Sequence, residues 1–319
     1  MHRAFHAIPP FMKTKEGEQV NAVFGFSMML LNIINGQKPD FLAISFDRAA
    51  KTFRHEAYKE YKATRTKAPD EFYAQIPRIR EVVDAFNIPV YELDGFEADD
   101  VLGTLATQAV KTPNLETYIV TGDMDTLQLI NDRVFVYAPQ GGFQQALIYN
   151  AKKVEEKYGL RPDQIVDLKA MKGDSSDNIP GVNGIGEKGA VKLLQEYDTL
   201  DSIYGNLDKI QGAIYDKLFL GKDAAYFSKH LATIVTDVPV KLDLAAAITH
   251  EYSKPKVIAL FEKLEFKSLL PKLQTPGDVS VVKMSPDDIP TIDSPIQAKP
   301  NFAKPKKTET KDESQQALF

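Results

Sequence analysis

The sequence predicts an α/β protein, with a doubly wound, mostly parallel sheet in its first half and a helical second half. Up to about residue 165, short β-branched runs alternate with segments of helical periodicity, which is the order typical of parallel sheets. Beyond that residue the pattern is helical. Carboxylates follow several predicted strands, at the edge of an open α/β sheet where ligands and substrates bind.

Apolar periodicity and stop signals define the individual elements. Apolar residues recur at helical spacing from Glu18 to Asn35, and Asn35-Gly36 supplies a stop. Pro77 predicts a kink or break in its helix. The predicted strands are 41–47, 88–93, 118–120, 133–137 and 143–149, and the predicted helices are 18–35, 70–87, 97–111, 152–158 and 165–172.

Composition excludes several classes of protein. The 319 residues include 43% hydrophobic and 26% charged residues, which is ordinary for a soluble globular protein. The longest apolar runs, such as Met28–Leu31, are far shorter than a membrane span, and the N-terminus lacks the apolar stretch of a secretory signal. The absence of cysteine excludes disulfides and thiolate metal sites and agrees with a reducing cytoplasm.

Charge is distributed unevenly along the chain, although the net charge is only −5. Residues 51–67 hold six Lys or Arg and two Glu, a net of +4, whereas residues 94–125 hold seven Asp or Glu and one Lys, a net of −6. This contrast suggests a phosphate-binding element beside a divalent-metal pocket. Two unrelated solvated faces would give the same pattern.

The basic segment alternates cations with aromatic residues, and Pro69 closes it. Its cations, among them Lys59, Lys62 and Arg65, recur at helical spacing and can neutralise phosphates. Tyr58 offers a face on which a base can stack. The alternative is an exposed amphipathic helix without a ligand.

Six carboxylates follow predicted strands or open the helix behind one. A single acid at such a position usually caps a helix or turn, but this number exceeds what capping needs. Like charges so close together repel one another unless a cation lies between them, so we expect a divalent-metal pocket. The six are Asp47, Glu97, Asp99, Asp100, Asp123 and Asp125.

A glycine-rich turn lies between two short predicted helices. Gly184, Ile185 and Gly186 lead into the second helix, with Lys188 in its first turn, so that free N–H groups and the positive end of the helix dipole can meet a phosphate. The turn lacks the Lys-Ser/Thr ending of a Walker A loop, and no strand leads into it as in a dinucleotide site. It has the form of a hairpin that grips a DNA backbone without reading sequence.

Five motifs, in this order, resemble those of the 5′ nuclease (flap endonuclease) family, and in particular the bacterial 5′-3′ exonuclease domains that accompany DNA polymerases. The resemblance covers roughly residues 1–273. The motifs are Phe53-Arg-His-Glu-Ala-Tyr58, Glu97-Ala-Asp-Asp100, Thr121-Gly-Asp-Met-Asp125, Gly173-Asp-Ser-Ser-Asp-Asn178 and Gly181-Val-Asn-Gly-Ile-Gly186.

The resemblance implies a PIN-like catalytic domain over residues 1–165, in which a helical arch (about 51–77) lies over the active site. It implies a helix–three-turn–helix DNA-binding subdomain over residues 166–273. From Thr275 onward the composition becomes rich in Pro, Lys, Asp, Ser and Thr, so residues 274–319 are expected to be a disordered tail.

The resemblance further implies hydrolysis with two Mg²⁺ ions, for which Mn²⁺ is a substitute, and a metal-activated water as the nucleophile. Two ions would also explain how so many clustered carboxylates stay ionised. The implied ligands are Asp47, Glu97 and Asp99 for one ion and Asp123, Asp125 and Asp174 for the other, with Asp100 and Asp177 contributing directly or through water.

The implied substrates are 5′ flaps and nicked or 5′-ended duplex DNA and RNA–DNA, as in primer removal and repair. Lys62 and Arg65 match the pair that steadies the scissile phosphate in the family. Arg54 and Arg3 match supporting phosphate contacts. The glycine hairpin matches the family's duplex clamp, which often holds K⁺ through backbone carbonyls.

The chain departs from the family pattern at its beginning. The family's first strand carries a metal-binding Asp-Gly, which by register would precede Met1, and His2 falls where an aromatic residue usually stacks on a nucleobase. Without that Asp we expect a chain that binds DNA better than it cuts it. Without the strand we expect unpaired sheet edges. A noncatalytic DNA-binding protein is therefore one alternative. A PIN-type RNase is another, but it would lack the basic segment and the hairpin.

The last residues suggest a protein partner. Gln315, Leu318 and Phe319 match the short Gln-x-x-Leu-Phe peptide by which bacterial replication proteins dock on the sliding clamp, and a linker into a further module is the alternative. The expected setting is the bacterial cytoplasm, with a monomeric chain and no membrane partner.

Overall fold

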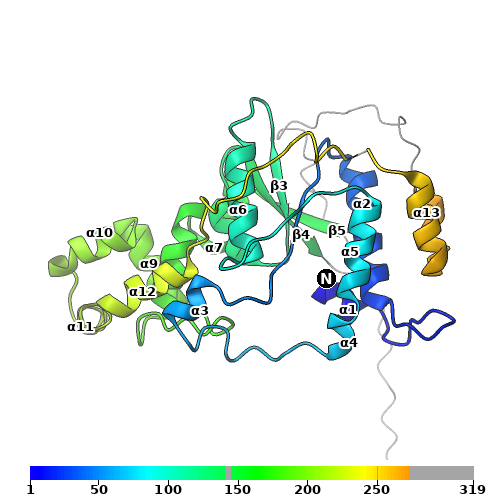
Figure 1. Cartoon of the computed structure of the whole chain (residues 1–319). Helices are drawn as coiled ribbons and strands as arrows, with labels where there is room; N and C mark the ends of the chain where they lie inside the picture. The colour runs from blue at the N-terminus through cyan, green and yellow to red at the C-terminus, as the bar shows by residue number, and fades with distance from the viewer. Residues whose placement is uncertain (141–144, 250, 274–319) are drawn as a thin grey trace, which may run out of the picture. The chain divides into compact units, whose positions relative to one another are not determined.

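Two small β-sheets take the place of one continuous sheet. In a computed structural model that describes residues 1–140, 145–249 and 251–273, β1 (Ile44–Ser45) pairs in parallel with β2 (Val90–Tyr91). β3 (Thr117–Val120) pairs in parallel with β4 (Val134–Gln140), which pairs antiparallel with β5 (Gln145–Tyr149) (Figure 1). The expected α/β fold with a mostly parallel sheet is thus confirmed, but the sheet comes in two pieces.

The first sheet is shorter than the apolar runs 41–47 and 88–93 predict. The carbonyl of Pro89 accepts from the Ile44 N–H at 3.0 Å, but Pro89 has no N–H with which to extend the ladder. Phe41 forms only an isolated bridge, with Ile248. A long apolar run therefore yields a ladder of two residue pairs.

Helices from both ends of the described chain share one apolar core with the residues that flank the first sheet. α2 packs against both α1 and α5, and α13 packs against α5, so the end of the described chain lies beside its beginning (Figure 1). The helices are α1 (His2–Ala7), α2 (Asn21–Gln37), α5 (Ile76–Ala85) and α13 (Lys254–Lys263).

α2 is the core helix predicted for residues 18–35, and Phe26, Leu30 and Ile34 on it are buried. It ends later than the predicted stop, because Gly36 lies inside the helix and Lys38 adopts the left-handed conformation, with φ of 47°. The stop signal was therefore located correctly only to within a few residues.

A second core joins β3–β5 to the helices that precede and follow them in the chain. α6 (Ala98–Ala109) packs on β3, and α7 (Ala151–Tyr158) packs on β5. α7 ends at Gly159, with φ of 68°, as the sequence predicts. The 3₁₀ helix η1 (Met124–Leu129) follows β3 directly, so it carries the residues at that strand's carboxyl end.

The second half of the chain is helical, as predicted, and has its own core. α8 packs against both α9 and α12, with Leu168 and Met171 of α8 buried in the contact. The helices are α8 (Ile165–Lys172), α9 (Glu187–Tyr197), α10 (Leu200–Gly205), α11 (Ala213–Leu220) and α12 (Lys222–Ala232), with short 3₁₀ helices η3 (Pro162–Gln164) and η4 (Leu207–Lys209). The 3₁₀ helix η5 (Leu270–Lys272) follows α13 and packs in the first core through Leu270.

Within the basic segment only α3 (Phe53–Ala57) is helical, and α4 (Asp70–Tyr73) begins just after Pro69. Residues 58–69 form turns and irregular chain, so the continuous helical spacing expected there is wrong. Long-range contacts override the local pattern: Lys62 has φ of 57°, and its N–H donates to the Asp177 carbonyl at 3.0 Å. The break predicted near Pro77 falls between α4 and α5.

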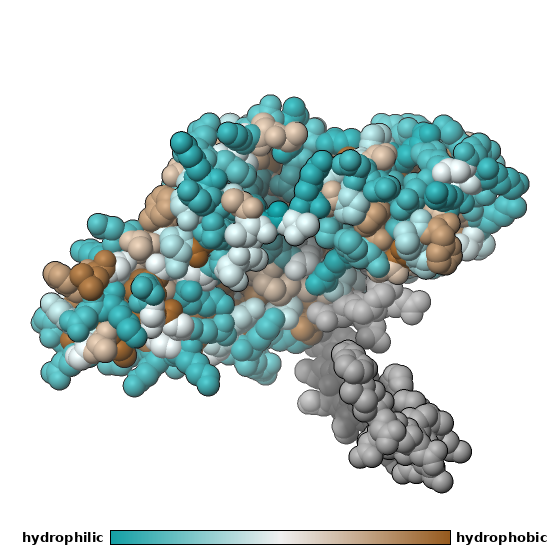
Figure 2. Space-filling model, turned by 90° about the horizontal axis from the view of Figure 1, so that it is seen from below, coloured by the Kyte–Doolittle hydropathy of each residue, from teal (hydrophilic) through white to brown (hydrophobic). Residues whose placement is uncertain are grey.

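The surface drawn in Figure 2 is mostly hydrophilic, with apolar residues in scattered groups. In the part of the chain that the structure describes, no helix has the length and apolar character needed to cross a membrane. The predicted tail 274–319, with its Gln315–Phe319 motif, and the beginning of the predicted strand 143–149 lie outside the described residues.

Candidate active site

The carboxyl ends of the strands bring most of the predicted acids together. Asp123 and Asp125 follow β3, and Glu97 and Asp99 open α6. Asp47 follows β1, and its carboxylate accepts the Ala98 N–H at the start of α6, at 2.9 Å. A cavity of about 20 Å³, room for one water molecule or ion, lies among these elements. Its lining residues are Arg54, Tyr61, Lys62, Glu97, Asp99, Asp123, Asp125, Asp177, Leu231, Ala232 and Ile234.

Asp100 differs from the other acids, because it is fully buried, with an exposed fraction of 0%. Its oxygens accept two hydrogen bonds from Arg54, at 2.7 and 2.8 Å, and two from backbone N–H groups, at 3.0 and 2.8 Å. Arg54 is 3% exposed and also donates to the carbonyls of Leu231 and Thr233, at 2.8 and 2.7 Å.

This geometry corrects two expectations. The Asp100 carboxylate accepts two hydrogen bonds on each oxygen and so has no oxygen left for a metal ion. The Arg54 guanidinium lines the cavity, but it donates to Asp100 and to two backbone carbonyls, so the chain itself already holds it. The pair instead fixes the first turn of α6, and with it Glu97 and Asp99, to α3 and to the chain that follows α12.

Local hydrogen bonds place the two acids after β3. Asp123 caps η1, and its Oδ1 accepts the Asp125 N–H at 3.0 Å. A Cβ on Gly122 would lie 3.1 Å from Cζ of Arg3, so glycine lets that guanidinium lie against the loop. Arg3 also donates to the Pro139 carbonyl at 2.8 Å. The predicted phosphate contact Arg3 therefore lies beside the acids, although the chain itself holds it.

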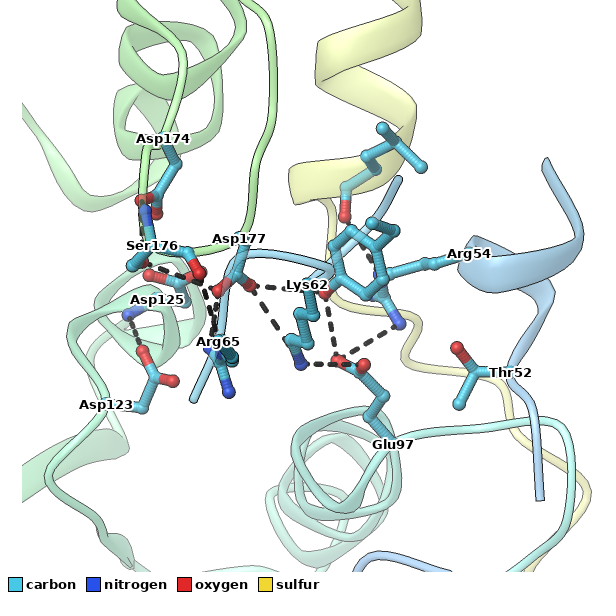
Figure 3. Close-up of polar contacts among 12 residues, drawn as sticks. Thr52, Arg54, Lys62, Arg65, Glu97, Asp123, Asp125, Asp174, Ser176 and Asp177 are labelled. Carbon is cyan, nitrogen blue, oxygen red and sulfur yellow. Dashed lines mark hydrogen bonds and ion pairs between the residues drawn. The ribbon is translucent and has the colours of Figure 1, made fainter. Parts of the chain in front are cut away.

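A loop closed by two glycines carries Asp174 and Asp177. Gly173 and Gly181 have φ of 74° and 65°, and a Cβ on Gly181 would lie 2.2 Å from the Gly173 nitrogen. Reciprocal backbone hydrogen bonds between Asp174 and Ile179, at 2.9 and 2.8 Å, close the loop. Only glycine fits both positions, so the backbone sets the direction of both carboxylates (Figure 3).

Besides Arg54, three cations of the chain contact predicted metal ligands. Figure 3 labels Lys62 and Arg65 among them. Two of them, Lys62 and Arg65, were predicted to lie at this site. Lys169 on α8 was missed, as was Tyr61, whose hydroxyl donates to Asp177 at 3.2 Å. The only sequence signal for Lys169 is its place on the helix that leads into the Gly173 loop. The pairs are Lys62–Glu97 (2.7 Å), Lys169–Asp174 (2.6 Å), Lys169–Asp125 and Arg65–Asp177.

Burial and mutual repulsion perturb the acids strongly. Burial raises the pKa of Asp99 to about 7, and the charges of three neighbouring acids add to the shift. Burial also raises the pKa of Asp125 to about 6, although the Lys169 ammonium opposes it. Burial would raise the pKa of Asp174 as well, but hydrogen bonds from Lys169 and Ser176 lower it to about 2. Raised carboxylate pKa values mark a cluster that a bound cation would stabilise.

The acidic side chains are of the type that binds a divalent metal ion, but they lie too far apart to hold one in this arrangement. Among the described residues, no three acidic or histidine side chains lie close enough together to hold an ion. Lys62, Arg65 and Lys169 contact these carboxylates instead. The donors are all carboxylate oxygens, which suit a hard ion such as Mg²⁺, and small side-chain movements would free them.

The glycine hairpin lies between α8 and α9, as predicted. Gly184 has φ of 80°, and Gly186 is the N-cap of α9. Lys217 on α11 donates to the Gly184 carbonyl at 3.0 Å. An open cavity of about 490 Å³ lies beside the hairpin, so two lysines and a helix N-terminus face one space. It is lined by Gly184, Ile185, Gly186, Glu187, Lys188, Gly189, Leu193, Ile214 and Lys217.

The other predicted DNA contacts lie at the surface. His2 is exposed on α1 and packs edge-on against Phe72. Tyr58 packs edge-on against Phe227, and Lys59 is exposed. Their role in binding DNA stays a prediction.

An acidic cavity at strand ends, a basic segment beside it and a glycine hairpin on the following helices define an α/β nuclease. The chain belongs to the 5′-3′ exonuclease family. The sequence model of the 5′-3′ exonuclease N-terminal resolvase-like domain matches residues 1–159, and that of the 5′-3′ exonuclease C-terminal SAM fold matches residues 160–255.

Similar curated proteins are bacterial DNA polymerases I. The DNA polymerase I of Caldicellulosiruptor bescii is 45% identical over 275 residues, which are 86% of this chain and 32% of that protein. The DNA polymerase I of Bacillus subtilis is 42% identical over 273 residues, which are 85% of this chain and 31% of that protein. The chain thus spans about a third of the length of these relatives.

Solved structures share the fold at low sequence identity. The T5 5′-exonuclease with zinc ions bound matches with a TM-score of 0.57 and 20% identity, over 83% of this chain and 94% of that one. The catalytic core of Rad2 in complex with a DNA substrate matches with a TM-score of 0.54 and 16% identity, over 85% and 89%. These likenesses confirm the expected fold, an α/β domain followed by a helical subdomain.

Proposed function

We propose that the chain is a 5′-3′ exonuclease and 5′-flap endonuclease that hydrolyses phosphodiester bonds of DNA and RNA primers in replication and repair. The observation that carries the proposal is the acidic cavity, which five carboxylates line beside Lys62. Such a cluster is costly for a folded chain unless it binds cations, and a cation-filled carboxylate site suits phosphodiester hydrolysis. Membership of the 5′-3′ exonuclease family supports the same reaction.

The proposed cofactors are two Mg²⁺ ions, for which Mn²⁺ can substitute. The all-carboxylate donor set supports a hard divalent ion, and divalent ions (zinc) are bound to the T5 5′-exonuclease. Bound ions would lower the pKa of a water molecule and neutralise negative charge on the reacting phosphate. The proposed ligands are Asp47, Glu97 and Asp99 for one ion and Asp123, Asp125 and Asp174 for the other, with Asp177 acting through water.

Lys62 and Arg65 are proposed to hold the scissile phosphate. Their side chains are 22% and 47% exposed, so both can be reached from solvent while they contact the acids. A phosphate oxygen can replace the carboxylate as their partner in a charge-assisted hydrogen bond, and the planar Arg65 guanidinium can bind two oxygens at once. Formation of the protein–DNA complex would therefore release Glu97 and Asp177 toward the metal ions.

The proposed substrates are branched, nicked and 5′-ended duplex DNA and RNA–DNA. The hairpin Gly184–Gly186, with Lys188 and Lys217, offers N–H groups and ammonium groups to backbone phosphates without reading bases, and K⁺ is proposed to bind its carbonyls. Tyr58, Lys59 and His2 would contact the unpaired 5′ strand by stacking and charge. The Rad2 catalytic core, which shares the fold, was solved with a DNA substrate.

The proposed setting is the bacterial cytoplasm, where the chain acts as a monomer and docks on the sliding clamp through Gln315, Leu318 and Phe319. Removal of Leu318 and Phe319 should abolish capture of the chain by immobilised sliding clamp and leave flap cleavage unchanged. Equal capture of both chains would contradict this docking.

The substrate class is tested with the full chain and Mg²⁺ on a 5′-labelled panel: a 5′-flap duplex, a nicked duplex, a blunt duplex and single-stranded RNA. We expect cleavage of the flap near its junction with the duplex, slower removal of nucleotides from the nicked 5′ end, and little attack on single-stranded RNA. Preferential cleavage of RNA would favour a PIN-type RNase instead. Tight binding of the flap without cleavage would favour a noncatalytic DNA-binding protein.

A further inference from the structure

Lys169 places one ammonium group on two acids of the candidate active site. Its Nζ lies 2.6 Å from Asp174 Oδ2 and also contacts Asp125 Oδ1. The three side chains are 12%, 16% and 20% exposed for Lys169, Asp174 and Asp125, so the ion pairs are largely shielded from water and from salt. Both acids are proposed ligands of the same metal ion, and Figure 3 shows them converging beside Ser176.

The hydrogen bonds of Asp174 leave only one oxygen free for a metal ion. Its Oδ1 already accepts from the Ser176 N–H at 2.8 Å and from the Ser176 hydroxyl at 2.6 Å. The other oxygen, Oδ2, is the one that Lys169 contacts. An ammonium and a divalent ion repel each other when both lie on one carboxylate oxygen, so a metal ion on Asp174 Oδ2 competes with Lys169 Nζ for it.

The backbone of Lys169 lies within a packed helix. Lys62 and Arg65 belong to the irregular stretch 58–69, whereas α8 has Leu168 and Met171 buried on either side of Lys169. The helix packs against α9 and α12. The ammonium can therefore leave Asp174 only by rotation of its own side chain, and it stays close enough to compete for the acids.

We infer that Lys169 regulates the metal site by competing with the second divalent ion for Asp125 and Asp174. This inference rests on the proposed two-metal function. Lys62 contacts Glu97 of the other proposed site, but it is 22% exposed against 12% for Lys169, so solvent screens its charge better and it competes less. The inference therefore implies that the ion on Asp123, Asp125 and Asp174 binds more weakly than the ion on Asp47, Glu97 and Asp99. The chain would then need a higher concentration of divalent ions for full activity than for binding of the first ion.

The test is direct binding of Mn²⁺ to the full chain, followed by the loss of the free-ion signal in electron paramagnetic resonance. Lys169→Met removes the competing charge but keeps a side chain of similar length. We expect the dissociation constant of the weaker-binding Mn²⁺ sites to fall by about tenfold or more in this variant, because a unit positive charge in contact with the ligands is removed. Lys169→Arg keeps the charge and should bind the weaker ion no more tightly than the unchanged chain.

Lys172→Met is the matched control, because Lys172 lies on the same helix but pairs with Glu187, at 2.8 Å, outside the acidic cluster. It should leave both classes of Mn²⁺ sites unchanged. Thermal unfolding of each variant in EDTA verifies that the chains compared are folded. Unchanged or weaker Mn²⁺ binding by folded Lys169→Met would overturn the inference and leave Lys169 a positioning residue.

Flap cleavage by the same chains separates this inference from the proposed function. If Lys169→Met tightens Mn²⁺ binding but no chain cuts a 5′ flap, the competition stands and the nuclease proposal fails. If the unchanged chain cuts the flap and binds two ions, but Lys169→Met binds them no more tightly, only the inference fails. If no chain binds Mn²⁺, both fail.

Discussion

The buried Arg54–Asp100 pair makes a sharp prediction about stability. Arg54→Met would leave the Asp100 carboxylate, 0% exposed, with two backbone N–H donors in place of four hydrogen bonds. Removal of one partner of a buried ion pair costs about 3–5 kcal/mol. Because the backbone donors remain, we expect the lower end, a loss of about 3 kcal/mol in the free energy of unfolding.

Urea unfolding of the full chain in EDTA, followed by circular dichroism, measures this loss. The control is Arg78→Met, which removes a guanidinium that pairs with Glu18 and Glu81 at the surface and should cost below about 1 kcal/mol. The double variant Arg54→Met with Asp100→Asn should recover part of the stability, because no charge is then buried without a partner and the amide oxygen can still accept from a backbone N–H. If Arg54→Met costs no more than Arg78→Met, the reasoning about this pair is refuted.

Three further predictions concern the site. Gly181→Ala puts a Cβ 2.2 Å from the Gly173 nitrogen, so the loop must shift; flap cleavage should fall about 100-fold, whereas Gly205→Ala, where a Cβ meets nothing within 4 Å, should cleave normally. Equal rates would contradict the role of the loop. Asp99 has a pKa of about 7 in the folded chain, against an ordinary value of 3.8. Between these two pH values the folded chain therefore binds more protons than the unfolded chain. The free energy of unfolding in EDTA should fall as pH rises from about 3.8 to about 7. Asp99→Asn should flatten the fall, and an identical slope would contradict the assignment. Arg65→Gln should weaken flap binding and lower the slope of log affinity against log salt by about 0.9, the value for one phosphate contact; an unchanged slope would place Arg65 away from phosphate.

The features that depend on residues close together in the sequence were predicted correctly. Asp123 and Asp125 were located because a short apolar run ends at Gly122, and the hairpin was located because Gly184 and Gly186 sit between two helices. Both features depend on residues close together in the chain. Their physical cause is therefore visible in a short stretch of sequence.

Long-range contacts account for the errors. Asp100 looked like the acids beside it, and only Arg54, 46 residues away, makes it a buried partner. Tyr61 and Lys62 fit a helical pattern, yet burial of Tyr61 and the hydrogen bond from the Lys62 N–H to Asp177 hold this stretch in turns. Lys169 lies 44 residues from Asp125, and its place on the helix before the Gly173 loop is the only sequence signal for that contact.

Single-turnover cleavage of a 5′-flap DNA tests the central claim, that the acidic cavity is a divalent-metal nuclease site. Asp123→Asn is the variant to compare, because an asparagine oxygen can still cap η1 while the charge is lost. We predict cleavage with Mg²⁺, none with EDTA, and a loss of at least about 100-fold in Asp123→Asn with flap binding retained. Cleavage that persists in EDTA, or at an equal rate in Asp123→Asn, would contradict the claim.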